Sequence, residues 1–154
     1  MPSGPGTENA MTDAAGFAAF VLLHRSPYER YAEARLGDRA LGHRAVAEAL
    51  RRTALDWTSL LSDQRAMACA WRILRETVTS ARAEAAGPGA DSLHLALPGP
   101  AADAVLLHHG LGYHPKVAAE LMGLAEPELQ VDLMAARRIL GSAGRGGEVG
   151  GQNH

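Results

Sequence analysis

Apolar residues recur at helical spacing in almost every segment between residues 13 and 140. No run of alternating β-branched residues bounded by turns competes with that pattern, so the sequence predicts an all-α fold. A first helix is predicted from Phe17 to about His24, and it must end before Pro27 because proline disfavours helical geometry in the residue that precedes it. Residues 26–29, Ser-Pro-Tyr-Glu, match a capping box with proline at the first helical position and predict the start of a second helix.

Two longer helices follow in the first part of the chain. Gly37 is predicted to end the second helix, and Asp38 is predicted to cap a third that runs from about Arg39 to Leu55. Residues 56–62 are expected to form a loop. The next helix has the most regular apolar face, with inward positions at steps of four, three, four and three, namely Met67, Trp71, Leu74, Val78 and Ala81.

A segment rich in glycine, proline and alanine interrupts the helical pattern after residue 85. It predicts a flexible linker over residues 86–96, which separates two domains at 13–85 and 97–140. The second domain is expected to contain three shorter helices, Ala101–His109, Pro115–Met122 and Glu126–Leu140. In the last of these helices four side chains are expected to face the core of the domain, namely those of Leu129, Leu133, Ala136 and Leu140. The two ends, residues 1–12 and 141–154, are predicted to lack regular structure because they are polar and rich in small residues.

Three residues of the second domain have the spacing of a helix-turn-helix. Ala119 is small enough for two helices to cross closely, Gly123 permits the left-handed turn between them, and Leu129 can lock the second helix in place. The predicted helix boundaries fall where this motif needs them. An ordinary three-helix packing unit would show the same spacing and is the alternative interpretation.

The sequence around this motif continues the pattern without a gap. It includes Leu97-Pro98, residues 103–107 (Asp-Ala-Val-Leu-Leu), residues 117–124 (Val-Ala-Ala-Glu-Leu-Met-Gly-Leu) and the apolar positions of residues 129–140. These residues together resemble the fourth region of extracytoplasmic-function sigma factors of RNA polymerase. Residues 17–50 are similar to the second region of the same family, above all at Tyr31-Ala32 and at residues 36–40 (Leu-Gly-Asp-Arg-Ala). Trp71 lies near the tryptophan that precedes the promoter-melting helix of the family.

The resemblance implies a transcription regulator that binds the RNA polymerase core and promoter DNA, and that carries out no chemistry of its own. A regulatory protein such as an anti-sigma factor is a further expected partner. The segment 41–50 would meet the polymerase clamp, with contacts from Leu41, Arg44, Ala45 and Glu48. Promoter DNA would be faced by two groups of residues, Arg72, Arg75 and Arg82 in the first domain and Glu128, Gln130, Asp132, Arg137 and Arg138 in the second.

The chain departs from the family pattern at both surfaces. The family commonly has an acidic run where Leu41, Gly42, His43 and Arg44 stand here, and of the acids only Glu48 remains. In the last helix, positions usually held by Thr, Lys, Ser and Arg are held by Glu128, Gln130, Val131, Asp132 and Ala135. A carboxylate repels phosphate and can accept a hydrogen bond only from cytosine among the base edges of the major groove.

The charge distribution agrees with the second departure, that of the last helix. Residues 17–86 contain eleven arginines and eight acids, whereas residues 97–140 contain three basic residues and five acids. Because affinity for nucleic acid depends on cations that displace counterions from phosphates, the second domain is poorly equipped for it. A second hypothesis is therefore a degenerate sigma-like module that has lost promoter reading and binds another protein. For Arg72, Arg75 and Arg82 a solvated helix face is the alternative interpretation.

The remaining residues favour neither an enzyme nor a metal protein. No phosphate-binding glycine loop follows a strand, and no Ser-His-acid set or buried carboxylate pair is recognisable, so we expect no catalytic residues and no cofactor. His108, His109 and His114 lack the cysteine or acidic partners of a known metal spacing. Of the two tryptophans, Trp71 is expected in the core and Trp57 nearer the surface. The lone cysteine, Cys69, is expected to be a buried thiol.

No apolar run reaches the roughly 20 residues that a membrane-spanning helix needs, and the first ten residues lack the pattern of a secretion signal. We therefore expect a soluble protein of the cytoplasm without a membrane partner.

Overall fold

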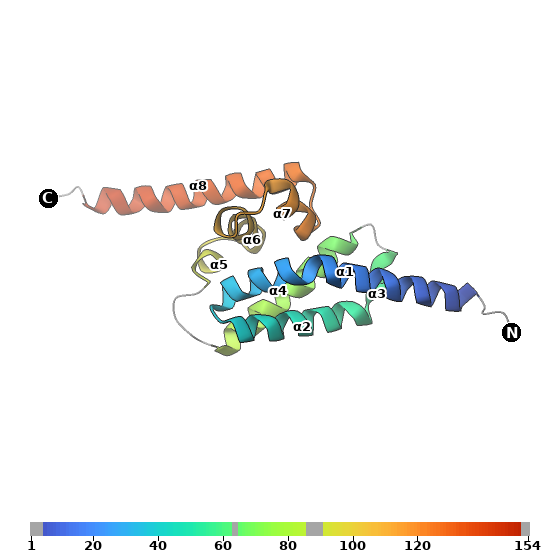
Figure 1. The fold of residues 1–154 in the computed structure, drawn as a ribbon. Coiled ribbons are helices and arrows are strands. Elements are labelled where there is room, and N and C mark those ends of the chain that lie inside the picture. Colours follow the sequence, from blue (N-terminus) through green and yellow to red (C-terminus); the bar gives the residue numbers. More distant parts are fainter. Residues whose placement is uncertain (1–4, 63–64, 86–90, 152–154) are drawn as a thin grey trace. The chain divides into compact units, whose positions relative to one another are not determined.

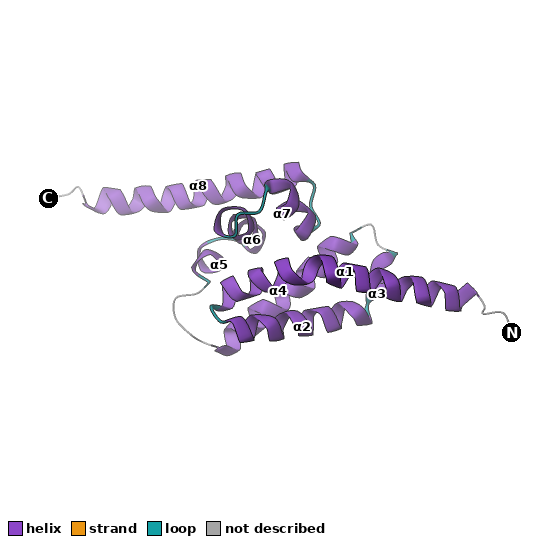
Figure 2. Ribbon diagram, viewed as in Figure 1, coloured by secondary structure: helices purple, strands orange, loops and turns teal. Residues whose placement is uncertain are grey.

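The computed structural model describes residues 5–62, 65–85 and 91–151, and it describes side chains for 11–62, 65–85 and 91–143. These residues form helices and the turns between them, without any strand, which confirms the all-α prediction (Figure 2). None of the described helices combines the length and the hydropathy needed to cross a membrane. The chain divides into two compact units, residues 1–90 (unit 1) and residues 91–154 (unit 2).

Unit 1 contains α1 (Pro5–Leu36), α2 (Arg39–Leu55), α3 (Trp57–Leu61) and α4 (Ala66–Ala85) (Figure 1). The helices α1, α2 and α4 pack against one another, and the short α3 joins them at one end. The predicted limits of α2 are confirmed. Gly37 ends α1 with a φ of 67°, and the Asp38 side chain accepts a hydrogen bond from the Leu41 amide at 2.9 Å, as the sequence predicted.

The first helix departs most from its prediction. It continues through Pro27, so the helix end before this proline and the capping box at residues 26–29 were both wrong. A proline inside a helix costs about 3 kcal/mol. The aromatic side chains on both sides of it, Phe20 and Tyr28, are both buried in the core of unit 1 and keep the helix continuous. The helix also begins at Pro5, so the expected lack of structure in residues 1–12 was wrong from Pro5 on, while residues 1–4 lie outside the described residues.

An aromatic cluster forms the centre of unit 1. Trp71 of α4 is fully buried, as predicted, and its ring centroid lies 5.6 Å from that of Tyr28 and 4.6 Å from that of Tyr31, both on α1. Trp57 extends the cluster, with its ring 5.2 Å from Phe20 and only 7% of its surface exposed. Trp57 is thus more exposed than Trp71, as predicted, but it is still buried in the core. The expected loop at residues 56–62 is instead largely the helix α3, which carries this side chain inward.

The helices α1 and α2 cross at a glycine. A Cβ atom on Gly42 would lie 2.9 Å from the backbone nitrogen of Glu33 and 3.1 Å from its α-carbon, closer than real side chains approach. Gly42 is buried, and its close approach to α1 leaves no room for a larger side chain at this position. The position therefore serves the packing of unit 1.

Unit 2 contains α5 (Ser92–Ala96), α6 (Gly99–Val105), the π-helix η1 (Leu106–Gly110), α7 (Pro115–Met122) and α8 (Glu126–Gly151) (Figure 1). The limits of α7 are those predicted, and the expected helix over residues 101–109 is present but changes into a π-helical turn. The predicted linker 86–96 is helical over α5, whereas residues 86–90 lie outside the described residues. The expected unstructured tail after residue 140 was wrong as far as Gly151, because α8 continues to that residue.

The turn between α7 and α8 has the predicted form. Ala119 and Leu129 are buried, and Gly123 adopts a left-handed φ of 71°. Ala136 packs against Leu97, Ala101 and Ala102. Leu133 is half-buried. Leu140, which was expected inward, is 40% exposed.

A buried histidine ties α5 to α6. The Nε2 atom of His94 lies 2.6 Å from Oδ1 of the fully buried Asp103, and its Nδ1 atom lies 3.3 Å from Oδ1 of Asp91. Asp91 precedes α5 with a φ of 74°, a conformation that costs a non-glycine residue about 1 kcal/mol or more. The contacts of His94 with both carboxylates stabilise this turn.

We expect Gly42→Ala to destabilise unit 1 by roughly 1–3 kcal/mol, because its Cβ would press on the backbone of α1. The matched control is Gly16→Ala in α1, whose Cβ would meet only Trp57 at an ordinary 3.8 Å. This control should gain about 0.5–1 kcal/mol from higher helix propensity. Both values come from urea unfolding followed by tryptophan fluorescence, which reports on unit 1 because both tryptophans lie there. Equal changes in the free energy of unfolding for the two variants would contradict the close crossing of α1 and α2 at Gly42.

The hydroxyl groups of Tyr28 and Tyr31 should differ in their effect on stability. Among the described residues the Tyr28 hydroxyl has no hydrogen-bond partner, and burial raises the pKa of its phenol. Tyr28→Phe should therefore raise the free energy of unfolding by about 1 kcal/mol. The Tyr31 hydroxyl accepts a hydrogen bond from Arg35 Nη1 at 3.2 Å. Tyr31→Phe removes this bond and should therefore lower the free energy of unfolding by a similar amount. Urea unfolding of the two variants checks this, and a loss of stability on Tyr28→Phe would contradict it.

Candidate functional site

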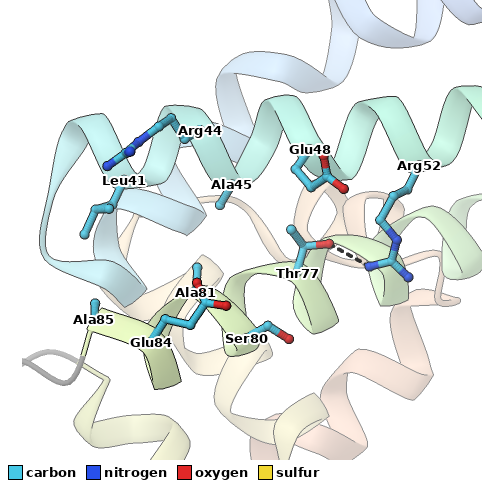
Figure 3. Close-up of a pocket in the computed structure, with 10 residues that line it drawn as sticks. All are labelled: Leu41, Arg44, Ala45, Glu48, Arg52, Thr77, Ser80, Ala81, Glu84 and Ala85. Carbon is cyan, nitrogen blue, oxygen red and sulfur yellow. Dashed lines mark hydrogen bonds between the residues drawn. The ribbon is translucent and has the colours of Figure 1, made fainter.

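A groove of about 550 Å³ lies between α2 and α4 of unit 1 (Figure 3). The four residues that the resemblance assigns to polymerase contact, Leu41, Arg44, Ala45 and Glu48, all line it. The other lining residues are Arg52 of α2 and Thr77, Ser80, Ala81, Glu84 and Ala85 of α4. The spacing of these four residues along α2 therefore places them on the same side of the helix, where they form one surface.

Small and apolar side chains form the floor of this groove. Figure 3 shows Leu41 and Ala45 pointing toward α4, and Ala81 and Ala85 pointing toward α2. The alanines leave space between the two helices because their side chains end at Cβ. The groove can thus accept an apolar side chain from a partner.

Arg52 fixes one end of the groove. Its Nη1 atom donates a hydrogen bond to Oγ1 of Thr77 at 3.0 Å, and its Nη2 atom lies 3.7 Å from a carboxylate oxygen of Glu76. The Thr77 hydroxyl in turn donates to the carbonyl oxygen of Ile73 at 2.7 Å. These contacts hold α2 to α4 across the groove, and they involve residues that the sequence did not single out.

The charges around the groove are partly neutralised. Arg51 donates two hydrogen bonds to the Glu48 carboxylate, at 2.7 and 2.9 Å. The hydrogen bond from Arg51 lowers the pKa of Glu48, so this carboxylate stays ionised. The pair is exposed and contributes little to stability. Arg44 is an exposed cation that lines the groove.

The predicted DNA-facing arginines of α4 differ in exposure. Arg72 is exposed and lies 3.9 Å from a Glu76 carboxylate oxygen, whereas Arg75 and Arg82 are half-buried. Of the three arginines only Arg72 is therefore exposed, and it lies beside an acid of the same helix.

The first turn of α8 uses its acids for helix capping. The Glu128 carboxylate accepts a hydrogen bond from the Ala125 amide at 3.1 Å, which is half of a capping box. Glu126 and Glu128 also lie at the positive end of the helix dipole, where carboxylates are stabilising. Asp132 is half-buried. Of the residues that the resemblance places at DNA, Glu128 therefore has a structural role within α8.

Arg137 and Arg138 of α8 lie on different sides of the helix. Arg137 lines a groove together with Gln130 and the histidines of η1, whereas Arg138 lines a shallow depression with Ala135, Ile139 and Ser142. Neighbouring residues of an α-helix point about 100° apart, so the pair does not form one cationic face.

The solvent side of α8 also carries apolar side chains. Val131 and Met134 are 62% and 61% exposed, and Ile139 and Leu140 are each about two-fifths exposed. Exposed apolar groups on a helix that would enter a DNA groove are unfavourable next to phosphates, and they are typical of a protein contact.

The histidines do not gather into a metal site. His108 Nδ1 donates to the carbonyl oxygen of Tyr113 at 2.8 Å, and the His114 side chain accepts from the Lys116 amide at 3.1 Å, where it caps α7. In the part of the chain that the structure describes, no group of three or more His, Cys, Asp or Glu side chains is arranged so that it could hold a metal ion. The expected buried thiol, Cys69, is half-buried.

Comparisons with known proteins provide no relative from which the site can be interpreted. No protein-family model matches the chain, and none of the curated proteins or solved structures matches it either.

Proposed function

We propose that this protein is a sigma-factor-like transcription regulator that associates with RNA polymerase and promoter DNA. The observation that carries the proposal is the groove between α2 and α4, which brings together Leu41, Arg44, Ala45 and Glu48. The turn at Gly123, with Ala119 and Leu129 buried on either side of it, supports the helix-turn-helix part of the proposal.

The groove supplies the two kinds of contact that a protein partner needs. An apolar side chain of the polymerase would lie on the floor formed by Leu41, Ala45 and Ala81, and Arg44 would pair with an acid of the polymerase at the rim. Because the Arg52 contacts with Thr77 and Glu76 keep α2 and α4 in place, the surface is formed before the partner binds. Arg72 of α4 would face the promoter.

Charge reversal at the rim tests the docking step. Arg44→Glu should weaken binding to core polymerase about tenfold or more, since a favourable ion pair becomes a repulsion. Binding is measured by co-elution of the full chain with core polymerase at low salt, and by run-off transcription from host promoters. The matched control is Arg25→Glu at an exposed position of α1 outside the groove, which should bind like the natural chain. Equal losses in both variants, or no polymerase binding by the natural chain, would contradict the proposal.

The solvent face of α8 favours a second function. Its first turn is acidic and its middle carries the exposed Val131 and Met134, a composition suited to a protein partner and not to phosphates. Under this second proposal the chain is a sigma-derived interaction module that has lost promoter reading. A regulatory protein of the anti-sigma kind would bind α8 through these apolar groups.

A DNA-retardation assay separates the two functions. If α8 has lost promoter reading, the full chain should bind host promoter duplexes no better than unrelated duplexes, even at about 50 mM salt where phosphate contacts are strongest. Sequence-selective retardation that weakens steeply with salt, and that Arg138→Gln reduces, would contradict the second function and support the first. Lys116→Gln, which removes an exposed cation from α7, is the charge-matched control.

A further inference from the structure

A second groove, of about 780 Å³, lies within unit 2 between η1 and α8. Seven of its lining residues come from one face of α8 and four from the segment 105–115. The residues are Val105, His108, His109, Pro115, Gln130, Leu133, Met134, Ala136, Arg137, Leu140 and Gly141. Its volume lies within the range of about 300–1,000 Å³ that is typical of small-molecule sites.

The π-helical turn shapes this groove. The wider turn is closed by hydrogen bonds from the Leu111 amide to the Leu106 carbonyl at 2.8 Å and from the Tyr113 amide to the Leu107 carbonyl at 2.9 Å. It presents two consecutive histidines, with ring centroids 4.5 Å apart, beside α8. Short π-helical turns inside helices occur often at functional sites.

The polar groups of the groove are suited to an anion. No lining residue is acidic, whereas Arg137, His108 and His109 all carry nitrogen donors or can do so. Arg137 is exposed, and it makes no hydrogen bond or ion pair with any residue whose side chain the structure describes. Its guanidinium is permanently charged and matches a carboxylate through two parallel hydrogen bonds.

The remaining surface of the groove is apolar. Leu133, Met134 and Leu140 contribute from α8, and Val105 contributes from the end of α6. Met134 and Leu140 are 61% and 40% exposed, so a ligand would cover apolar surface that is now in contact with water. A single permanent cation next to apolar side chains fits one anionic head with an apolar tail better than the regular row of phosphates in a nucleic acid.

We propose that this groove binds a small amphipathic monocarboxylate, of the medium-chain fatty-acid class. The carboxylate pairs with Arg137, and His109 adds a second donor at the rim. The tail lies against Leu133, Leu140 and Val105. Because Arg137 and Gln130 belong to the face that the helix-turn-helix would use, the ligand competes with any macromolecule that contacts those two side chains.

Octanoate is the probe for this site, titrated into the full chain by calorimetry and followed by backbone amide shifts. We expect saturable binding with shifts concentrated at residues 105–115 and 130–141. Arg137→Gln should weaken binding roughly tenfold or more, because it removes a charge-assisted pair. The matched control is Arg138→Gln, which removes the neighbouring cation from outside the groove and should leave the octanoate affinity within about twofold.

Four results would overturn the proposal. Octanoate shifts spread over unit 1 and unit 2 alike would indicate nonspecific apolar binding. Equal weakening by Arg137→Gln and Arg138→Gln would show that the groove does not select the anion, and octanol binding as tightly as octanoate would show that the head group is not recognised. Displacement of octanoate by inorganic phosphate at equal concentration would assign the cation to phosphates instead. Thermal unfolding of each variant confirms that it is folded.

Discussion

The close crossing of α1 and α2 at Gly42 is the constraint on which unit 1 depends. Because the Gly42 position lies against the backbone of Glu33, α2 is held near α1, while α4 closes the bundle through Trp71 packed on Tyr28 and Tyr31. The groove between α2 and α4 follows from this arrangement, since α2 can face α4 with Leu41 and Ala45 only while its other side packs on α1. A larger residue at Gly42 would therefore disturb both the core and the groove.

Local signals allowed the prediction of α2 and α7 at their observed limits. Asp38 caps α2, Pro115 begins α7 and Gly123 ends it, and each acts within a few residues of the sequence. The errors came where distant contacts outweigh local preference. Pro27 predicts a break, yet the helix continues because aromatic side chains on both sides of the proline are buried in one cluster. The helix α3, where a loop was expected, likewise depends on the contacts of Trp57 with aromatic side chains of α1.

The two grooves differ in how far the sequence could predict them. Leu41, Ala45 and Glu48 lie along one side of a helix by their spacing, so the α2 surface followed from the predicted helix once the family resemblance had singled out the segment. The groove beside η1 could not be predicted in this way. It needs a π-helical turn closed by backbone hydrogen bonds across residues 106–113, and no residue pattern distinguishes this turn from an ordinary helix end. The buried contact of His94 with Asp103 was missed for the same reason, since it joins two helices.

Helix stability and DNA reading compete for the same positions at the start of α8. A recognition helix reads DNA best with cations and amides in its first turns, but here Glu128 caps the Ala125 amide, and Glu126 and Glu128 complement the helix dipole. These acids therefore stabilise the long α8 at the expense of attraction to phosphate. The two arginines of α8 whose side chains the structure describes, Arg137 and Arg138, point to different sides of the helix. Of these two arginines only Arg138 lies outside the groove beside η1, so a ligand in that groove would leave one of the two for DNA.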